Sequence, residues 1–273
     1  MVIGLEVLRE AFKGYEDCYT IIGGTACDIL MSRQNLDFRA TKDIDMILLI
    51  ENRFEEFGTV LWKFIKAGQY KCGWKNSKNL QFYRFTEPQN SNYPIMIELF
   101  SKNPGYQLHD IEAVITPLHI SDEISSLSAI MLNDDYYEFM LSGRKTVNGV
   151  GVLGAEHLIP FKMKAWLDLC RRKNEGEHVN SKDIKKHKND VFRLMNIINP
   201  EERIDLPETV QDDVNKFVER MPEERINMKN IGLDMELYDA LHILENYVFV
   251  IKKKSNKNQQ NRHSSHFAGP FMF

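Results

Sequence analysis

The chain has 273 residues, of which 43% are hydrophobic and 27% charged, a balance typical of a globular protein that buries its core without disulfides. Acidic residues exceed basic residues by 39 − 35 = 4, so the overall charge gives no case for nucleic-acid binding. The four cysteines lack metal-ligand spacing, and no apolar run approaches the roughly 18 to 20 residues that span a bilayer, so we expect free thiols, no membrane segment and a cytoplasmic location.

The first hundred residues alternate between helical and strand patterns. Residues 1–17 have the spacing of an amphipathic helix and lack the features of a signal peptide. Helices are also expected over residues 25–33 and over residues 53–67, where apolar side chains recur on one face. Short apolar runs favour buried strands over residues 18–22, 43–50, 80–85 and 94–101.

The pattern changes to helical near residue 155. Before it, short strands are expected at 127–132, 136–141 and 145–152; after it, helices are expected at 155–172, 181–198, 208–220 and 235–252. Pro160 either marks the true start of the first of these helices or kinks it. The expected organisation is an α/β domain over residues 1–152, a helical domain over 153–252 and a polar, basic, mobile tail over 253–273.

A glycine pair stands between the first predicted strand and the following helix. Gly23 and Gly24 have no Cβ, so the backbone there can approach a ligand closely. The helix begins with unpaired N–H groups and a partial positive charge, which suit phosphate oxygens, and Thr25 adds a hydroxyl donor. The alternative is an ordinary structural turn, and the glycines alone do not decide between the two.

Two acidic residues open the next predicted strand. Asp43 and Asp45 are two positions apart, so both carboxylates point to the same face. Like charges that close repel unless a cation lies between them, and magnesium prefers carboxylate oxygens together with substrate phosphates. The alternative is a solvated strand start in which the acids have no role.

A third acid lies in a later strand. Glu98 is the only charged residue in the segment PIMIELFS, and a lone buried acid is costly unless it is paired or binds a metal. If its strand lies beside the Asp43 strand, the three carboxylates form a two-metal site. The alternative is a salt bridge between Glu98 and a neighbouring Arg or Lys.

Together, these motifs resemble the nucleotidyltransferase superfamily with the polymerase-beta-like fold. More narrowly, the chain resembles the AbiEii-type nucleotidyltransferases, the toxins of abortive-infection (type IV) toxin–antitoxin pairs. The narrower resemblance rests on Arg39-x-Thr41-x-Asp43-x-Asp45, and on Lys162-x-Lys164 followed by Lys182-Asp183. It covers roughly residues 18 to 195. The fold it implies is α+β: a mixed sheet with flanking helices, followed by a C-terminal helical bundle.

The resemblance implies a role for each matching residue. Asp43 and Asp45 would coordinate two Mg²⁺ ions and Glu98 would complete one metal site, with in-line attack on the α-phosphate of an NTP. Gly23, Gly24 and Thr25 would hold the β- and γ-phosphates, with Arg39 and Thr41 supporting that loop or the phosphates. Lys164 would neutralise triphosphate charge, and Asp183 would orient Lys164 or contact the base or acceptor.

Two of these roles have structural alternatives. Lys164 has the spacing for a surface pair with Asp168. Asp183 stands in what looks like the first turn of a helix capped by Ser181.

Other residues receive structural interpretations. His157, His178 and His187 lack metal-ligand spacing and are interpreted as surface residues. The run from Lys185 to Lys188 is interpreted as a solvated helix face, with contact to an RNA acceptor as the alternative. The aromatic group Tyr136, Tyr137 and Phe139 is interpreted as core.

The leading functional hypothesis is therefore an NTP-dependent nucleotidyltransferase. By the resemblance, its acceptor would be the 3′ end of tRNA or a protein hydroxyl, and a cognate antitoxin would be its partner. A second hypothesis is a small-molecule nucleotidyltransferase, for example one that modifies an aminoglycoside. A third is a catalytically silent nucleotide-binding module that acts through a partner, although such a module has no need of three crowded carboxylates.

Overall fold

The computed structural model describes residues 2–49, 53–77, 80–101, 116–117, 133–199, 203–245 and 249–250. Within these residues, eight strands form one mixed sheet. In spatial order they are β6 (Thr116–Pro117), β3 (Lys71–Ser77), β4 (Leu80–Thr86), β5 (Met96–Ser101), β2 (Asp43–Leu48), β1 (Tyr19–Ile22), β8 (Val150–Leu153) and β7 (Arg144–Val147).

The centre of this sheet combines both kinds of pairing. Strand β2 runs antiparallel to β1 and parallel to β5, and β4 runs antiparallel to β5. All four residues of β1 are buried, while in β2 the two acids are partly exposed and Ile44 and Met46 are buried. The prediction of a mixed sheet with helices is confirmed. Its assignment to the polymerase-beta-like fold remains a prediction.

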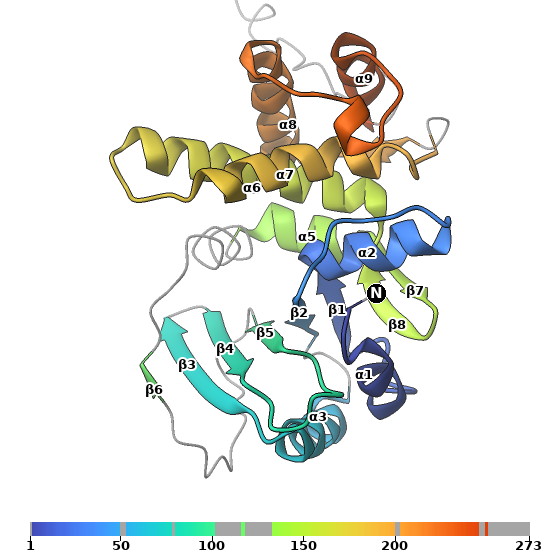
Figure 1. Ribbon diagram of the computed structural model, residues 1–273, viewed down its shortest axis with the longest axis vertical. Coiled ribbons are helices and arrows are strands. Elements are labelled where there is room, and N and C mark those ends of the chain that lie inside the picture. Colours follow the sequence, from blue (N-terminus) through green and yellow to red (C-terminus); the bar gives the residue numbers. More distant parts are fainter. Residues whose placement is uncertain are drawn as a thin grey trace, which may run out of the picture.

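The helices lie mainly in two groups. Figure 1 shows α1 (Leu5–Ala11) and α3 (Phe54–Gly68) at one end of the sheet, and α2 (Gly23–Arg33) between the sheet and the long helices α6 (Ala155–Asn174) and α7 (Ser181–Leu194). Helix α6 packs against α2, α7 and α8 (Glu208–Arg220). The remaining described elements are α5 (Asp134–Ser142), α9 (Leu237–Ile243), two short 3₁₀ helices (Met221–Glu223 and Lys229–Ile231) and the parallel pair β9 (Ile204–Asp205) and β10 (Phe249–Val250).

The buried side chains of the sheet and of α6, α7 and α8 belong to one hydrophobic core. The expected domain boundary at residue 152 falls near the end of β8, and it stays a prediction. All four cysteines are free, as expected, and all four are buried. No helix in the described part of the chain combines the length and apolar character needed to cross a membrane.

One predicted strand is a helix. Residues 136–141 lie in α5, where Asn133 caps the N-terminus by accepting a hydrogen bond from the Tyr136 N–H. The strand prediction was wrong because it overlooked Asn133 as an N-cap, with Asp134 and Asp135 in the first turn. The three aromatic side chains are buried, so their interpretation as core is confirmed.

Other differences concern boundaries and turns. The strand predicted over 145–152 is the hairpin of β7 and β8, which turns at Asn148 and Gly149, both with left-handed φ.

Strand β3 was not predicted because its sequence KCGWKNS lacks β-branched residues. Pro160 lies inside α6 and does not mark its start. The helix predicted over 235–252 ends at Ile243, and the strand predicted over 127–132 and the tail over 253–273 lie outside the described residues.

Candidate functional site

A row of side chains crosses the centre of the sheet. Asp45 on β2 is opposite Ile22 on β1 and Glu98 on β5, and Glu98 is in turn opposite Arg84 on β4. Residues opposite each other on adjacent strands point to the same face of a sheet, so Arg84, Glu98 and Asp45 share one face. Asp43 precedes Asp45 by two positions and shares that face. The predicted adjacency of the two acid-bearing strands is confirmed.

Glu98 is held between a cation and another acid. Its Oε1 accepts a hydrogen bond from Arg84 Nε at 2.7 Å and forms an ion pair with Arg84 Nη2 at 2.6 Å, so the salt bridge that the sequence left as an alternative is present. Burial raises the pKa of Glu98 above its ordinary value, and the Asp43 charge raises it further. Arg84 and a hydrogen bond with Asp45 only partly offset this increase. Asp45 and Glu98 therefore interact directly.

The glycine turn fits closely around the acids. Gly23 has φ +70°, and a Cβ placed on it would lie 2.0 Å from Asp45 Oδ2. A Cβ on Gly24 would lie 2.7 Å from Thr41 Oγ1. The Thr25 hydroxyl donates to the Asp43 carbonyl oxygen at 2.5 Å, which ties the start of α2 to the start of β2. Thr25 is fully buried in this position.

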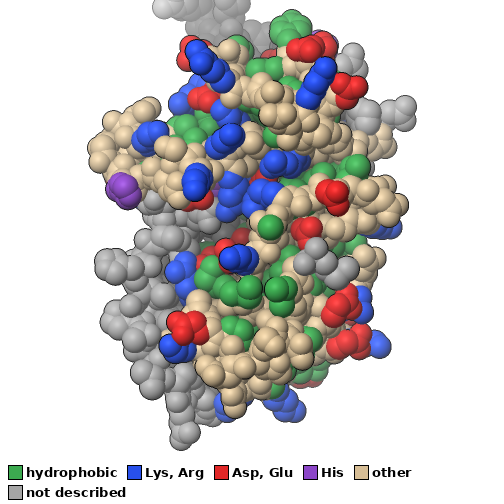
Figure 2. Space-filling model, in the orientation of Figure 1, with side chains coloured by type: hydrophobic (Ala, Val, Ile, Leu, Met, Phe, Trp, Pro, Cys, Tyr) green, Lys and Arg blue, Asp and Glu red, His purple; other side chains and the backbone are tan. Residues whose placement is uncertain are grey.

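A cavity opens between this part of the sheet and the helices. Lys162 comes from α6 and Lys186 and His187 come from α7, opposite the acids. The cavity is lined by Ile22, Gly23, Gly24, Asp45, Glu98, Leu158, Phe161, Lys162, Ala165, Lys186 and His187. Figure 2 shows Lys and Arg side chains gathered across the middle of this face of the molecule. The cavity thus joins carboxylates on one wall to cations on the other.

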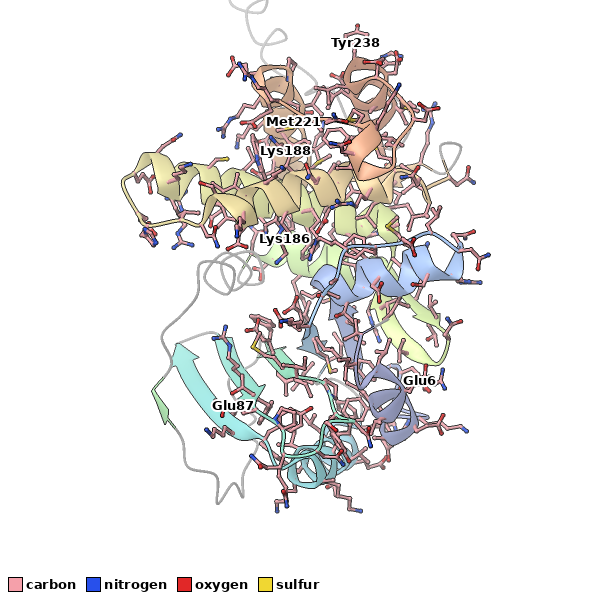
Figure 3. All side chains as sticks on the ribbon, in the orientation of Figure 1. Glu6, Glu87, Lys186, Lys188, Met221 and Tyr238 are labelled. Atoms are coloured by element: carbon pink, nitrogen blue, oxygen red, sulfur yellow. The ribbon has the colours of Figure 1, made fainter. Side chains whose placement is uncertain are left out.

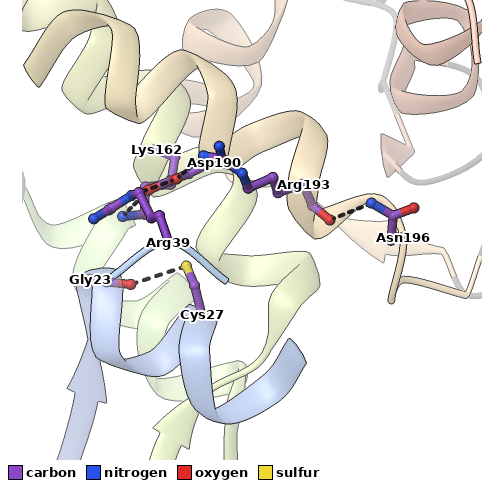
Figure 4. A network of polar contacts seen from close by, with 7 residues as sticks. All are labelled: Gly23, Cys27, Arg39, Lys162, Asp190, Arg193 and Asn196. Atoms are coloured by element: carbon purple, nitrogen blue, oxygen red, sulfur yellow. Dashed lines mark hydrogen bonds and ion pairs between the residues drawn. The ribbon is translucent and has the colours of Figure 1, made fainter. Parts of the chain in front are cut away.

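The cations beside the cavity are organised around one buried carboxylate, Asp190 on α7 (Figure 4). Arg39 donates to both its oxygens, at 3.0 Å and 2.7 Å, while Lys162 Nζ and Arg193 Nη1 each lie 3.2 Å from one of them. Although burial alone would raise the pKa of Asp190, Lys162 and Arg39 hold it well below its usual range. Three cations surround a single negative charge, so this network carries a surplus of positive charge.

Lys164 lies on a different face of α6 from Lys162. The cavity-lining residues Leu158, Phe161, Lys162 and Ala165 have helical spacing, and Lys164 falls outside that stripe. Its Nζ is 2.9 Å from Asp213 Oδ2 on α8. The structure therefore does not bring Lys164 to the acids. The alternative pair with Asp168 is not formed either, and Asp168 instead pairs with Arg171 at 2.8 Å.

Helix α7 differs from its predicted surface role. Its N-cap is Asn180, whose side chain accepts from the Lys182 N–H, so the expected Ser181 cap is wrong. Asp183 lies one turn before the cavity-lining Lys186 and His187 and is partly buried. Figure 3 shows Lys186 on the side of α7 toward the sheet and Lys188 on the opposite side.

The interpretation of residues 185–188 as a solvated face holds for the exposed Lys185 but is wrong for Lys188 and does not describe Lys186 and His187. Lys188 is buried and pairs with Glu224, and Lys186 and His187 line the cavity. His157 is also buried, against Phe139, so its surface interpretation is wrong, whereas His178 is exposed. Sequence reasoning missed Arg84 and Asp190. The helical stripe from Leu158 to Ala165 was the available signal for Lys162, because a lysine inside an apolar stripe is buried and needs a partner.

Among the residues that the structure describes, no group of three or more His, Cys, Asp or Glu side chains is arranged to hold a metal ion. The chemistry of the donors nevertheless fits a hard divalent cation, since Asp43, Asp45 and Glu98 offer carboxylate oxygens on one face of the sheet. Arg84 already occupies one oxygen of Glu98. The acids thus offer the kind of ligand that Mg²⁺ prefers, while the guanidinium of Arg84 is bound to one of them, Glu98.

Comparison with models of protein families gave no match, and comparison with curated proteins gave none either. Among solved structures, the chain is similar to the crystal structure of an antigenic nucleotidyltransferase-like protein from Paracoccidioides brasiliensis. The sequence identity is 15% and the TM-score 0.43, over 88% of this chain and 90% of that chain. A similarity of this size does not decide a function, which has to be inferred from the site itself.

Proposed function

We propose that the chain is a Mg²⁺-dependent nucleotidyltransferase that transfers NMP from an NTP to a macromolecular acceptor. The observation that carries this proposal is the contact of Gly23 with Asp45, beside Glu98, across a cavity from Lys162 and Lys186. Carboxylates suit metal ions, and cations with a helix N-terminus suit phosphates. A nucleoside triphosphate bound to Mg²⁺ presents both kinds of charge at once.

Each wall of the cavity has a part in this proposal. Asp43, Asp45 and Glu98 would hold Mg²⁺, which when bound neutralises phosphate charge and activates the attacking hydroxyl. The N–H groups that open α2 at Gly23 and Gly24 would bind the leaving phosphates. Lys162 takes the charge-neutralising role that the sequence assigned to Lys164, because Lys162 lines the cavity.

Arg39 and Thr41 support the loop that leads into Asp43. Arg39 binds both oxygens of Asp190, and Thr41 Oγ1 lies against Gly24. The loop is thereby fastened to α7 on one side and to the glycine turn on the other. This arrangement supports a positioning role for both residues, which is one of the two roles, support of the loop or of the phosphates, that the sequence left open.

For the acceptor, we propose the 3′ end of an RNA such as tRNA, with a protein hydroxyl as the alternative. Lys182 and Lys185 are exposed on α7, near the cavity-lining Lys186, where they would meet phosphates of an incoming strand. A toxin-like role with a cognate antitoxin follows from the resemblance of the motifs alone and is part of this proposal.

The proposal is tested with α-labelled NTPs, supplied one base at a time to the full chain with a cell extract. We expect Mg²⁺-dependent labelling that EDTA abolishes and that Asp43→Asn and Asp45→Asn each remove while the fold is retained. Asp212→Asn, at an exposed position on α8, is the matched control and should label normally.

The fraction that carries the label identifies the acceptor. Label in RNA supports the leading acceptor, and label in protein supports the alternative. Labelling of only a small molecule, such as an aminoglycoside, would refute a macromolecular acceptor. NTP binding by calorimetry without any labelling would indicate a silent binding module, and labelling that survives both Asp substitutions would refute the mechanism.

A further inference from the structure

The acids at the centre of the sheet have a built-in counter-ion. Arg84 and Glu98 are opposite each other on β4 and β5, and their side chains are 15% and 8% exposed. Both Nε and Nη2 of Arg84 bind the same oxygen, Oε1. Charge-assisted contacts of this length, largely removed from water, are strong. Glu98 is thus fixed from the side away from Asp45, by a cation that does not line the cavity.

This contact opposes a divalent cation on the other side of Glu98. Asp45 lies next to Glu98 in the row and both line the cavity, so an ion held by the acids would share Glu98 with Arg84. The guanidinium places a positive charge beside Asp43, Asp45 and Glu98, and it retains one oxygen of Glu98. Each effect weakens binding of a free metal ion.

We propose that Arg84 is a positioning residue that makes metal binding by the acids depend on the nucleotide. In the free chain, Arg84 serves as the cation that Glu98 requires, and the acids take up a divalent ion weakly. Phosphate oxygens of a bound triphosphate supply the ligands that Glu98 does not fully provide. This inference rests on the proposed function, because it assumes that Asp43, Asp45 and Glu98 form the metal site.

The test measures Mn²⁺ binding to the full chain by the electron paramagnetic resonance signal of free Mn²⁺. Binding is measured without nucleotide and with an NTP whose α- and β-phosphates are joined by a methylene group. Arg84→Gln should bind Mn²⁺ about ten-fold tighter than wild type without nucleotide, since it removes an adjacent positive charge. With the nucleotide present, the gain should shrink. Arg84→Lys, which keeps the charge, should stay within about three-fold of wild type.

Two further variants make the result specific. In Glu98→Gln, adding Arg84→Gln should give a smaller gain in affinity than in the wild type, because Arg84 no longer competes for a Glu98 oxygen. Arg84→Met is a second neutral variant if Arg84→Gln fails to fold, as judged by circular dichroism. Unchanged or weaker Mn²⁺ binding in the neutral variants would overturn the role of Arg84.

Asp45→Asn separates this failure from failure of the proposed function. If Asp45→Asn abolishes Mn²⁺ binding but the neutral Arg84 variants behave as wild type, the metal site stands and the inference about Arg84 is wrong. If Asp45→Asn leaves Mn²⁺ binding intact both with Arg84 present and in the neutral Arg84 variants, the acids are not the metal site. The proposed function is then overturned together with the inference.

Discussion

At Gly23 the backbone lies close to the carboxylate of Asp45. The Gly23 φ of +70° is unfavourable for other residues, and an added Cβ would overlap Asp45 Oδ2. That oxygen is the end of a side chain, so the carboxylate can turn away from the new methyl group. A substitution here therefore displaces Asp45 more than it disrupts the fold.

Gly23→Ala should lower the free energy of unfolding by about 1–2 kcal/mol, the cost of the left-handed backbone. It should reduce labelling activity about 100-fold, since Asp45 is moved. Gly176→Ala is the matched control, because Gly176 also has positive φ, at +88°, and nothing within 4 Å. Urea unfolding and the labelling rate are measured for both. An equal loss of activity in the two variants would contradict the role of the Gly23 contact.

His157 is the residue that should make stability depend on pH. Its Nε2 lies 3.2 Å from Ser142 Oγ and its ring stacks on Phe139 at 4.4 Å. Burial lowers the pKa of His157 from 6.5 to about 4, so the unfolded chain takes up a proton first as the pH falls. The stabilisation is complete above about pH 6.5 and is lost as the pH falls toward 4.

Between pH 7.5 and pH 4, this residue should account for about 2–3 kcal/mol of the lost free energy of unfolding. His157→Gln should flatten the pH dependence, whereas His178→Gln, at an exposed position, should leave it unchanged. Urea unfolding at several pH values measures both. A wild-type slope in His157→Gln would show that another group is responsible.

Helix α6 carries two lysines with different surroundings. Lys162 lines the cavity and is 3.2 Å from Asp190, while Lys164 is 2.9 Å from Asp213 on α8. Residues two apart in a helix point in different directions, so the two lysines serve different neighbours. Substituting each lysine in turn therefore compares a residue of the candidate site with a residue that holds two helices together.

Lys162→Met should reduce labelling about 100-fold, because a cation opposite the carboxylates is lost. Asp190 keeps Arg39 and Arg193 in this variant, so the fold should survive. Lys164→Met should label within about three-fold of wild type. It should lose stability instead, because the buried carboxylate of Asp213 loses the positive charge of Lys164. Labelling and thermal unfolding are measured for both variants. The reverse ranking in labelling would return the phosphate-binding role to Lys164.

At the scale of the whole molecule, the sheet and the helices share one core. Unfolding should therefore be a single transition, even though the chain is longer than most two-state domains. Trp62 on α3 and Trp166 on α6 report on the two ends of this core. Variants that keep Trp62 or Trp166 as the only one of the chain's three tryptophans should show the same urea midpoint by fluorescence as by circular dichroism. Two separate midpoints would instead support independent domains divided near residue 152.

The sequence predicted those helices and strands whose own residues show a clear hydrophobic pattern. The strand DIDMIL, the glycines that begin α2 and the helices after residue 155 follow from spacing and composition. Strand β3 and helix α5 were not recognised, because the first depends on pairing with β4 and the second on a cap at Asn133. The pairing of β3 with β4 is not visible in the pattern of β3 itself, whereas the Asn133 cap is a local signal that was overlooked.

The candidate site shows the same division. The adjacency of Asp45 and Glu98 was inferred from two apolar strands and is confirmed. Arg84 and Asp190 were missed because their partners lie 14 and 151 residues away, and nothing in the surrounding sequence indicates them. Lys162 faces the cavity and Lys164 does not, because of the way α6 is rotated about its axis. The apolar residues of α6 alone do not indicate which side of the helix faces the sheet.

The order in which the cavity walls occur along the chain has a consequence for synthesis. The acids lie in β2 and β5, while the cations facing them come from α6 and α7, which ends at Leu194. At the usual rate of about 5 to 20 residues per second, the ribosome makes the second wall several seconds after the first. During that interval, the nascent chain carries the carboxylates without their opposing lysines. The proposed activity therefore cannot begin before α7 has been synthesised.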